Sequence, residues 1–287
     1  MAIDSGLVEY LDWGTTTTIA TSVGKVTGGA ITPGDSAAVH REAIGAQDKV
    51  TGGPIPVGGN ATFQVANYDL LTYAVRSAFT APTLTEVCLA GGVVGYGRKQ
   101  TGCKINTLEL SCAIGEPLTA NMSWLGLTDE VDATAAKSYL SDVVFEWFMA
   151  ATLINSAAVQ CTGFTLTINN NLEHIWTLDT STAASRRLPD AIRIGSQQVA
   201  LSVDVLTRPD ATAYTDILAD TLAVDIPALF TFSDGGTSST DDFTITLSQL
   251  SRFTAPIPLV VGGGMVSYTQ TFEAPNDTSC ISITCAA

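Results

Sequence analysis

The feature that most constrains the fold of this chain is a repeated alternation of apolar and polar side chains. In the segment VALSVDV, residues 199–205, apolar residues occupy every second position and Ala, Ser and Asp lie between them. The segment FTLTI, residues 164–168, alternates Phe, Leu and Ile with two threonines. Successive side chains of an extended strand point to opposite faces, so a period of two predicts strands with one buried face. An all-β chain is therefore expected.

Further strand-like segments and only two helix-like windows occur along the sequence. Lys104–Cys112 alternates and then slips in phase at Thr107 and Leu108, which predicts a bulge or bend. Helical spacing is confined to Asn67–Phe79 and Asp210–Leu222, so one or two short helices are expected beside the strands. The other predicted strands are 61–65, 120–125, 243–250 and 266–272.

Three consecutive asparagines, Asn169, Asn170 and Asn171, follow the strand predicted at 164–168. Asn tolerates left-handed backbone conformations and bonds its own backbone, so the run predicts a sharp turn at the strand end. If one of them has a positive φ, Ala should cost about 1 kcal/mol there, and Gly should be tolerated.

The alternation also assigns side chains to faces. We expect Phe164, Leu166, Leu201 and Val203 to face the core, because a register slip of one residue would expose every apolar side chain of a strand. Polar residues between apolar ones then lie on the other face, directed to solvent or to a neighbour; the candidates are Glu109, Thr165, Thr167, Ser202 and Asp204.

Two long segments stand out between the predicted strands. Residues 24–60 are rich in Gly, Pro and Ala, which predicts a long loop or arm, and loops of this length are usually functional or disordered. Residues 233–242 separate two strand-like runs and predict a protruding hairpin loop. Its aspartates, Asp234, Asp241 and Asp242, should lie in water or against a cationic partner. The whole of 1–287 is interpreted as one domain.

The charge balance argues against a nucleic-acid-binding protein. The chain has 13 Lys and Arg against 28 Asp and Glu, a formal charge of −15, and no stretch gathers basic residues into a stripe. The N-terminus carries acidic residues where a secretory signal would carry basic ones, so the protein is expected to stay in the compartment where it is made. No apolar run approaches the length of a membrane-spanning helix.

No motif for catalysis, metal binding or cofactor binding stands out. Six scattered cysteines form no CxxC pair and are best explained as small buried apolar residues rather than ligands or obligatory disulfides. The two histidines, His40 and His174, lie in no nucleophile motif and are expected to be exposed polar residues. We therefore expect no enzyme activity, no metal and no cofactor.

Four stretches together resemble the tail tube proteins of long-tailed bacteriophages with non-contractile tails. In that family, a strand turns back through a second strand ending in Gly, and a later strand enters an Asn-Asn-Leu-Glu turn that precedes a Pro and an Ile-x-x-Gly. The order and spacing of these features, rather than any single motif, carry the resemblance. The stretches are GCKINTLELSCAIGEPLTANMSWLG (102–126), VFEWFMAATLINSAAVQCTGFTLTINNNLE (144–173), LPDAIRIGSQQVALSVDV (188–205) and GGGMVSYTQTFEA (262–274).

The resemblance implies a β-sandwich or barrel whose inner sheets join into a continuous barrel when six copies form a ring. Stacked rings would enclose a channel for DNA, and the candidate face residues would point to this lumen or to a neighbouring copy. The loop that carries Asp234, Asp241 and Asp242 would lie between successive rings. The partners would be further copies of the chain and the tail terminator, tape measure and distal tail proteins. DNA would pass without specific binding, and the protein would be made in the host cytoplasm and reside in the virion tail. A carboxylate lining, which repels phosphates, suits that role.

Other interpretations of the sequence stay open. A head-decoration or tail-terminator protein of a phage would have a similar β-rich sequence. A carbohydrate-binding or adhesion module on a β-sandwich would need an exposed aromatic platform, for which the four tryptophans, Trp13, Trp124, Trp147 and Trp176, are the candidates. A hydrolase on an all-β scaffold would need a nucleophile and a base that converge.

Overall fold

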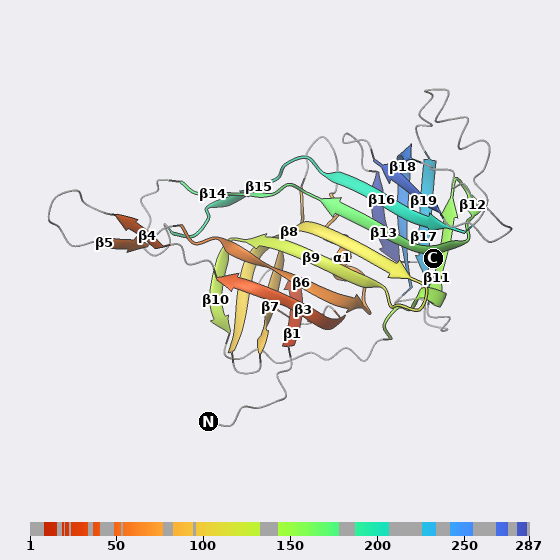
Figure 1. Ribbon diagram of the computed structural model, residues 1–287. Coiled ribbons are helices and arrows are strands. Elements are labelled where there is room, and N and C mark those ends of the chain that lie inside the picture. Colours follow the sequence, from red (N-terminus) through yellow and green to blue (C-terminus); the bar gives the residue numbers. More distant parts are fainter. Residues whose placement is uncertain are drawn as a thin grey trace.

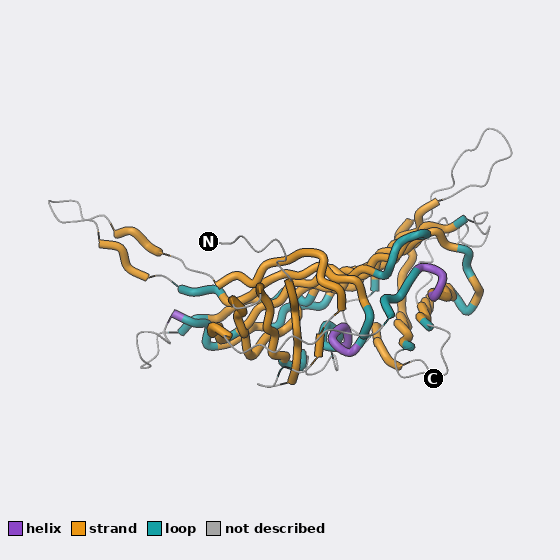
Figure 2. The backbone as a smooth tube through the Cα atoms, turned by 90° about the horizontal axis from the view of Figure 1, so that it is seen from below, coloured by secondary structure: helices purple, strands orange, loops and turns teal. Residues whose placement is uncertain are grey.

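The computed structural model consists almost entirely of antiparallel strands (Figures 1 and 2). It describes residues 9–15, 19, 21–22, 24–33, 37–40, 49–52, 54–76, 83–93, 96–132, 143–177, 187–206, 226–233, 242–254, 268–274 and 280–285. The strands are β1 (Glu9–Thr15), β2 (Thr21–Ser22), β3 (Gly24–Pro33), β4 (Ala37–His40), β5 (Lys49–Gly52), β6 (Val57–Val65), β7 (Val87–Val93), β8 (Tyr96–Ala113), β9 (Thr119–Gly126), β10 (Thr128–Asp132), β11 (Ala150–Ile154), β12 (Ala157–Ala158), β13 (Cys161–Asn169), β14 (Glu173–Ile175), β15 (Ala191–Arg193), β16 (Gln198–Val205), β17 (Ile226–Phe232), β18 (Phe243–Thr254), β19 (Tyr268–Glu273) and β20 (Ile281–Cys285). The helical elements are α1 (Asp69–Thr72) and a 3₁₀ turn at Trp147–Met149.

A central sheet with the order β3-β6-β9-β8-β13-β16-β19 organises the molecule. Two long strands continue from it into further sheets. The first part of β8 pairs with β7 and β10, while its later part pairs with β9 and β13. Most of β18 pairs with β17 and β20, and its last residues pair with β19. Two strands that change sheets in this way fold one continuous sheet into packed layers.

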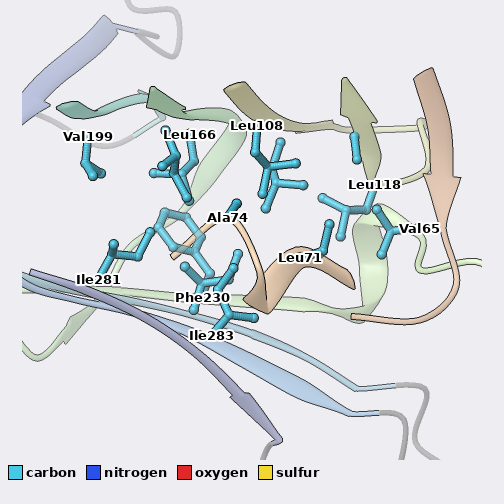
Figure 3. Close-up of a cluster of buried hydrophobic side chains, with 14 of the residues drawn as sticks. Val65, Leu71, Ala74, Leu108, Leu118, Leu166, Val199, Phe230, Ile281 and Ile283 are labelled. Carbon is cyan, nitrogen blue, oxygen red and sulfur yellow. The ribbon is translucent and has the colours of Figure 1, made fainter. Parts of the chain in front are cut away.

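The main core lies between the central sheet and the sheet of β17, β18 and β20. Figure 3 shows Leu108, Leu166 and Val199 of the central sheet on one side and Phe230 and Ile283 on the other. The rings of Phe164 and Phe230 meet across this core with centroids 4.5 Å apart. Two layers that bury their apolar faces against each other form a sandwich. The all-β prediction is confirmed.

The strands predicted from alternation are all present, although Val266 and Ser267 lie outside the described residues. The predicted phase slip in β8 is confirmed as well. The register against β9 shifts between Ile105 and Thr107, and Ile105 and Leu108 are both buried. The extra residue, Asn106, lets two apolar runs of opposite phase face the same core.

The predicted helix at Asn67–Phe79 is wrong in its length, because α1 has only four residues. After it, the backbone continues in i to i+3 hydrogen bonds, with Ala74 N donating to Leu71 O and Val75 N donating to Thr72 O. Leu70, Leu71 and Ala74 are buried, and their spacing of one and four residues places them on one face, so this short segment buries a single apolar stripe. Residues 77–79 and the second predicted helix, 210–222, lie outside the described residues.

The prediction of a long loop or arm at 24–60 is wrong as to the loop, because the described residues of this segment are mostly in strands. Residues 24–33 form β3, which pairs with β6, and residues 37–52 contain the hairpin of β4 and β5, which projects from one end of the molecule (Figure 1). The glycines of the segment allow strands to approach closely. A Cβ on Gly59 would lie 2.4 Å from the ring of Trp124 and 2.6 Å from the carbonyl oxygen of Ala30.

The strands on either side of 233–242 pair with each other, with Phe232 of β17 opposite Phe243 of β18. Ser233 Oγ donates a 2.6 Å hydrogen bond to Asp242 Oδ2 at the base of this loop. Asp234 and Asp241 lie outside the described residues, so protrusion of the loop stays a prediction, as does the single domain. The described helices include none that is long and apolar enough to cross a membrane.

Candidate functional site: the polar face of the central sheet

The solvent-directed face of the central sheet carries polar side chains in straight rows across neighbouring strands. One row consists of hydroxyl residues alone, and each residue is the direct cross-strand partner of the next: Thr119, Ser111, Thr165, Ser202 and Thr271 on β9, β8, β13, β16 and β19. All five are partly exposed. We call this set the hydroxyl row.

A second row lies beside the hydroxyl row and contains carboxylates. It consists of Asn121, Glu109, Thr167, Ala200 and Glu273 on the same five strands. Thr167 is half-buried, and the other four residues of this row are exposed. Carboxylates therefore flank a neutral centre on this part of the sheet.

Two outer rows complete the surface. The first holds Ser123, Thr107, Asn169 and Gln198, and the hydroxyls of Thr107 and Ser123 are 2.5 Å apart. The second holds Ala113, Gly163, Asp204 and Thr269, where Thr269 Oγ1 donates a 2.5 Å hydrogen bond to Asp204 Oδ1. We call the four rows together the polar face.

The polar face is acidic and lacks cations. Its charged residues are Glu109, Asp204 and Glu273, and none of the residues in its four rows is Lys or Arg. Lys104, which precedes these residues on β8, forms an ion pair with Glu86 at 3.2 Å. Beyond the four rows, Thr119 pairs with Gln64 of β6, and Gln64 pairs with the exposed Lys25 of the edge strand β3. Neutral hydroxyls and amides hydrogen-bond water and carboxylates repel phosphates, so within the four rows no side chain attracts a polyanion.

Burial of the opposite face fixes which side chains form the rows. Phe164, Leu166, Leu201 and Val203 are 6%, 0%, 1% and 0% exposed, so the predicted register is confirmed. The predicted residues Glu109, Thr165, Thr167, Ser202 and Asp204 do lie together on one face. Sequence reasoning missed Ser111, Thr119, Asn121, Thr271 and Glu273. The alternation around Ser111 and Thr271 was visible, but the cross-strand register that aligns them was not.

Asn170 is the centre of a buried polar junction at one end of the polar face. Its side chain is fully buried, and Nδ2 donates to the carbonyl oxygens of Ala74 and Ile105, both at 2.9 Å. Its Oδ1 accepts a 2.8 Å bond from Gln197 Nε2, which also donates to Ala74 O at 3.2 Å. One amide therefore ties the α1 segment, the β8 bulge and the approach to β16 to the end of β13.

The neighbouring asparagines form the turn that the sequence predicted. β13 ends at Asn169, whose Oδ1 accepts a 3.0 Å bond from Asn171 N, and Asn171 has φ +48°. Asn171 Nδ2 donates to Ser196 O at 2.7 Å. Gly195 packs against this turn so closely that a Cβ there would lie 2.4 Å from Asn171 O. The strand end is thus clamped to the loop that precedes β16.

His174 and the cysteines differ in part from their predictions. His174 is half-buried rather than exposed, with Nε2 3.1 Å from Gly126 O, and desolvation lowers its pKa. Four cysteines are buried as expected, and desolvation raises the pKa of Cys112 to about 11. Cys161 is half-buried and Cys285 is exposed. No group of three or more His, Cys, Asp or Glu within the described ranges could hold a metal ion.

The tryptophans divide between core and surface. Trp13 and Trp124 are 7% and 1% exposed, and Trp124 Nε1 donates to Gln100 Oε1 at 2.7 Å. Trp147 and Trp176 are 42% and 39% exposed. Trp147 lines a hollow together with Cys161 and Gly163 at the start of β13, whereas Trp176 follows β14, beyond the end of β13, so the two do not form the shared platform that a carbohydrate-binding module would need.

Comparisons with known proteins address the identity of the chain. No curated protein matches the sequence. A family described as phage tail tube protein matches residues 12–274, which include every strand of the polar face. Because the match covers far more than half of the sequence, this chain belongs to the phage tail tube protein family.

Proposed function

We propose that six copies of this chain form a ring, that rings stack into the tube of a long, non-contractile tail, and that the polar face lines the channel through which DNA passes. Membership of the family makes the chain a structural component of the virion tail and not an enzyme. The observation that carries the proposal is the polar face, a continuous five-strand surface of hydroxyls, amides and carboxylates without a cation.

The chemistry of this face suits a channel that must release its contents. A Lys or Arg lining would neutralise phosphates and release counterions, which is the main source of affinity for DNA. Glu109, Asp204 and Glu273 oppose that binding, and the hydroxyl row presents only short neutral side chains. The same sheet continues through Gln64 of β6 to the exposed Lys25 of β3, so each copy would add one lysine at the edge of the wall against three carboxylates. DNA would then meet a wetted wall whose net charge is negative.

The edges of the central sheet support assembly into a ring. β3 is at one end of the strand order, and at the other end β18 covers only part of β19. Exposed strand edges tend to pair with other chains unless they are protected. Pairing of the β3 edge of one copy with the β19 edge of the next would join the polar faces into one closed wall.

Charge sets the conditions for assembly. Six copies of −15 each would carry −90 in one ring, so salt, which shortens the Debye length to about 8 Å at physiological strength, should promote polymerisation. In the virion, the tail terminator, tape measure and distal tail proteins would occupy the ends and the interior of the tube.

Lysines placed on the polar face test the lumen assignment. Thr165→Lys and Ser202→Lys would put cations in the wall, while Ser282→Lys, on an exposed position of β20, is the matched control. Tubes would be assembled with short duplex DNA, treated with DNase and sedimented. We expect protected DNA only in the first two variants, and its amount should fall as salt is added.

Two results would contradict the proposal. Equal DNase protection in the Ser282→Lys tubes would show that the polar face is not the lumen wall. A wild-type protein that stays monomeric across a salt series, by sedimentation and electron microscopy, would contradict ring and tube formation themselves.

A further inference from the structure

An exposed aromatic cluster surrounds a hollow at one end of the central-sheet strands. Ile114, Trp147 and Phe148 are 54%, 42% and 65% exposed, and the two aromatic rings meet edge to face with centroids 6.0 Å apart. The hollow has a volume of about 460 Å³, and its lining, which includes Cys161 and Leu206, contains no charged residue. Ligand pockets begin at about 300 Å³, so there is room for a bulky side chain. We call this site the aromatic hollow.

A second exposed apolar pair lies beyond the other end of the same strands. Ile175 and Trp176 are 37% and 39% exposed and follow β13 through the asparagine turn. We call this pair the Trp176 end.

The register of the strands shows that the two sites are at opposite ends. β8 ends at Ala113, directly before Ile114, and Ala113 pairs with Gly163 near the start of β13. β13 then runs away from the hollow to Asn169, from which the chain continues to Trp176. Figure 1 shows the same separation, with β14 and β15 far from β11 and β12.

The charges of the two sites differ as well. The described residues 111–118 and 143–163, around the hollow, hold Glu116 and Glu146 and neither Lys nor Arg. Residues 170–177 and 187–197, around the Trp176 end, hold two acidic residues, Glu173 and Asp190, and two arginines, Arg187 and Arg193. A contact of the hollow with its own copy would bring four carboxylates together without a cation, whereas a contact with the Trp176 end would bring the same number of carboxylates together with two arginines.

We propose that the aromatic hollow of one copy receives the Trp176 end of a second copy of this chain, and that this head-to-tail contact joins successive rings along the strand direction. The inference rests on the proposed tube and names the surfaces that stack it. A contact between two different patches propagates without limit, as a filament requires, whereas a patch that binds itself stops at a pair.

The chemistry of the contact favours these residues as its anchors. In a chain of charge −15, an uncharged hollow is where a second acidic copy meets little repulsion. Tryptophan and other aromatic residues in desolvated pockets dominate binding energies at protein interfaces. Burial of Phe148 and Trp176 would also cover apolar area that the single subunit leaves in water.

Three variants test the contact: Phe148→Glu in the hollow, Trp176→Glu at the other end, and Val131→Glu as the control. Val131 is 71% exposed on β10 and belongs to neither site. All three positions are on the surface, so each subunit should fold, which circular dichroism checks. By sedimentation and negative-stain imaging, the first two should form single rings that do not stack below about ten times the wild-type assembly concentration, and the control should form tubes.

Mixing the two ring-forming variants gives the sharpest result. Each variant has one intact site, so an equal mixture should form pairs of rings, and assembly should stop at two rings. Tubes from either variant alone, or a loss of stacking in Val131→Glu, would overturn the inference and leave the hollow to another tail protein. If the wild type forms no rings, both the proposed function and the stacking contact are contradicted. Normal tubes from Phe148→Glu would contradict the stacking contact alone.

Discussion

Replacement of the buried Asn170 by Ala should destabilise the subunit far more than the same change at either neighbouring asparagine. The Asn170 side chain makes three hydrogen bonds at 2.8–2.9 Å and is fully buried. Ala would remove the donor to Ile105 O and the acceptor for Gln197, although Gln197 would keep its bond to Ala74 O.

The magnitude follows from the number of groups that lose a partner. An intramolecular hydrogen bond contributes about 0.5–1.5 kcal/mol net, and a buried polar group left unpaired costs about 1–3 kcal/mol. Asn170→Ala should therefore lower the free energy of unfolding by about 2–4 kcal/mol. Asn171→Ala, at φ +48° and exposed, should cost about 1 kcal/mol with Gly tolerated, and Asn169→Ala should cost less than about 1 kcal/mol.

Asn170→Asp separates hydrogen bonding from side-chain volume. The carboxylate keeps the shape of the amide but cannot donate, and it would face two carbonyl oxygens in the core. Burial would raise the pKa of this Asp in the folded state. The free energy of unfolding of the variant should therefore approach that of the wild type as the pH falls, because the protonated carboxyl group regains a donor.

Urea unfolding at low salt, where assembly is suppressed, measures these differences on the free subunit. The order of losses should be Asn170, then Asn171, then Asn169. An Asn170→Ala variant within about 0.5 kcal/mol of wild type, or no more affected than Asn169→Ala, would refute the junction as a source of stability.

Three further predictions concern packing and titration. Leu201→Ala should cost about 2–5 kcal/mol in urea unfolding and Ser202→Ala should have little effect, and equal losses would contradict the register. Gly195→Ala should cost about 1–3 kcal/mol, because its Cβ would lie 2.4 Å from Asn171 O. An unchanged midpoint of urea unfolding would show that the loop shifts to accommodate the added methyl group. Burial lowers the pKa of His174 from 6.5, so the unfolded chain binds the proton more readily and stability should fall as the pH drops below about 6.5. His174→Gln should reduce that fall, and an identical pH profile would exclude His174 as its cause.

The alternating strands could be predicted from the sequence because the apolar positions within each strand identify its buried face. Leu201 and Ser202, or Phe164 and Thr165, differ in polarity at neighbouring positions, and this local contrast is enough to assign them to opposite faces. Even the bulge at Asn106 leaves a local trace, because the apolar positions change phase around it.

The missed features depend on partners that are distant in the sequence. Glycines of β3 and β6 suggested a loop, but Gly59 is required by Trp124 on a neighbouring strand. Asn170 resembled its two neighbours in the turn, and its burial arises from carbonyl groups 96 and 65 residues earlier in the chain. The hydroxyl row likewise exists only once the register aligns Ser111 with Thr165 and Ser202 with Thr271.

Cryo-electron microscopy of tubes assembled from the purified protein tests the central claim most directly. We expect rings of six copies whose inner wall is the polar face, with Glu109, Thr165 and Ser202 pointing into the channel and β3 of one copy beside β19 of the next. A tube in which the polar face is buried between subunits, or faces the outside, would contradict it.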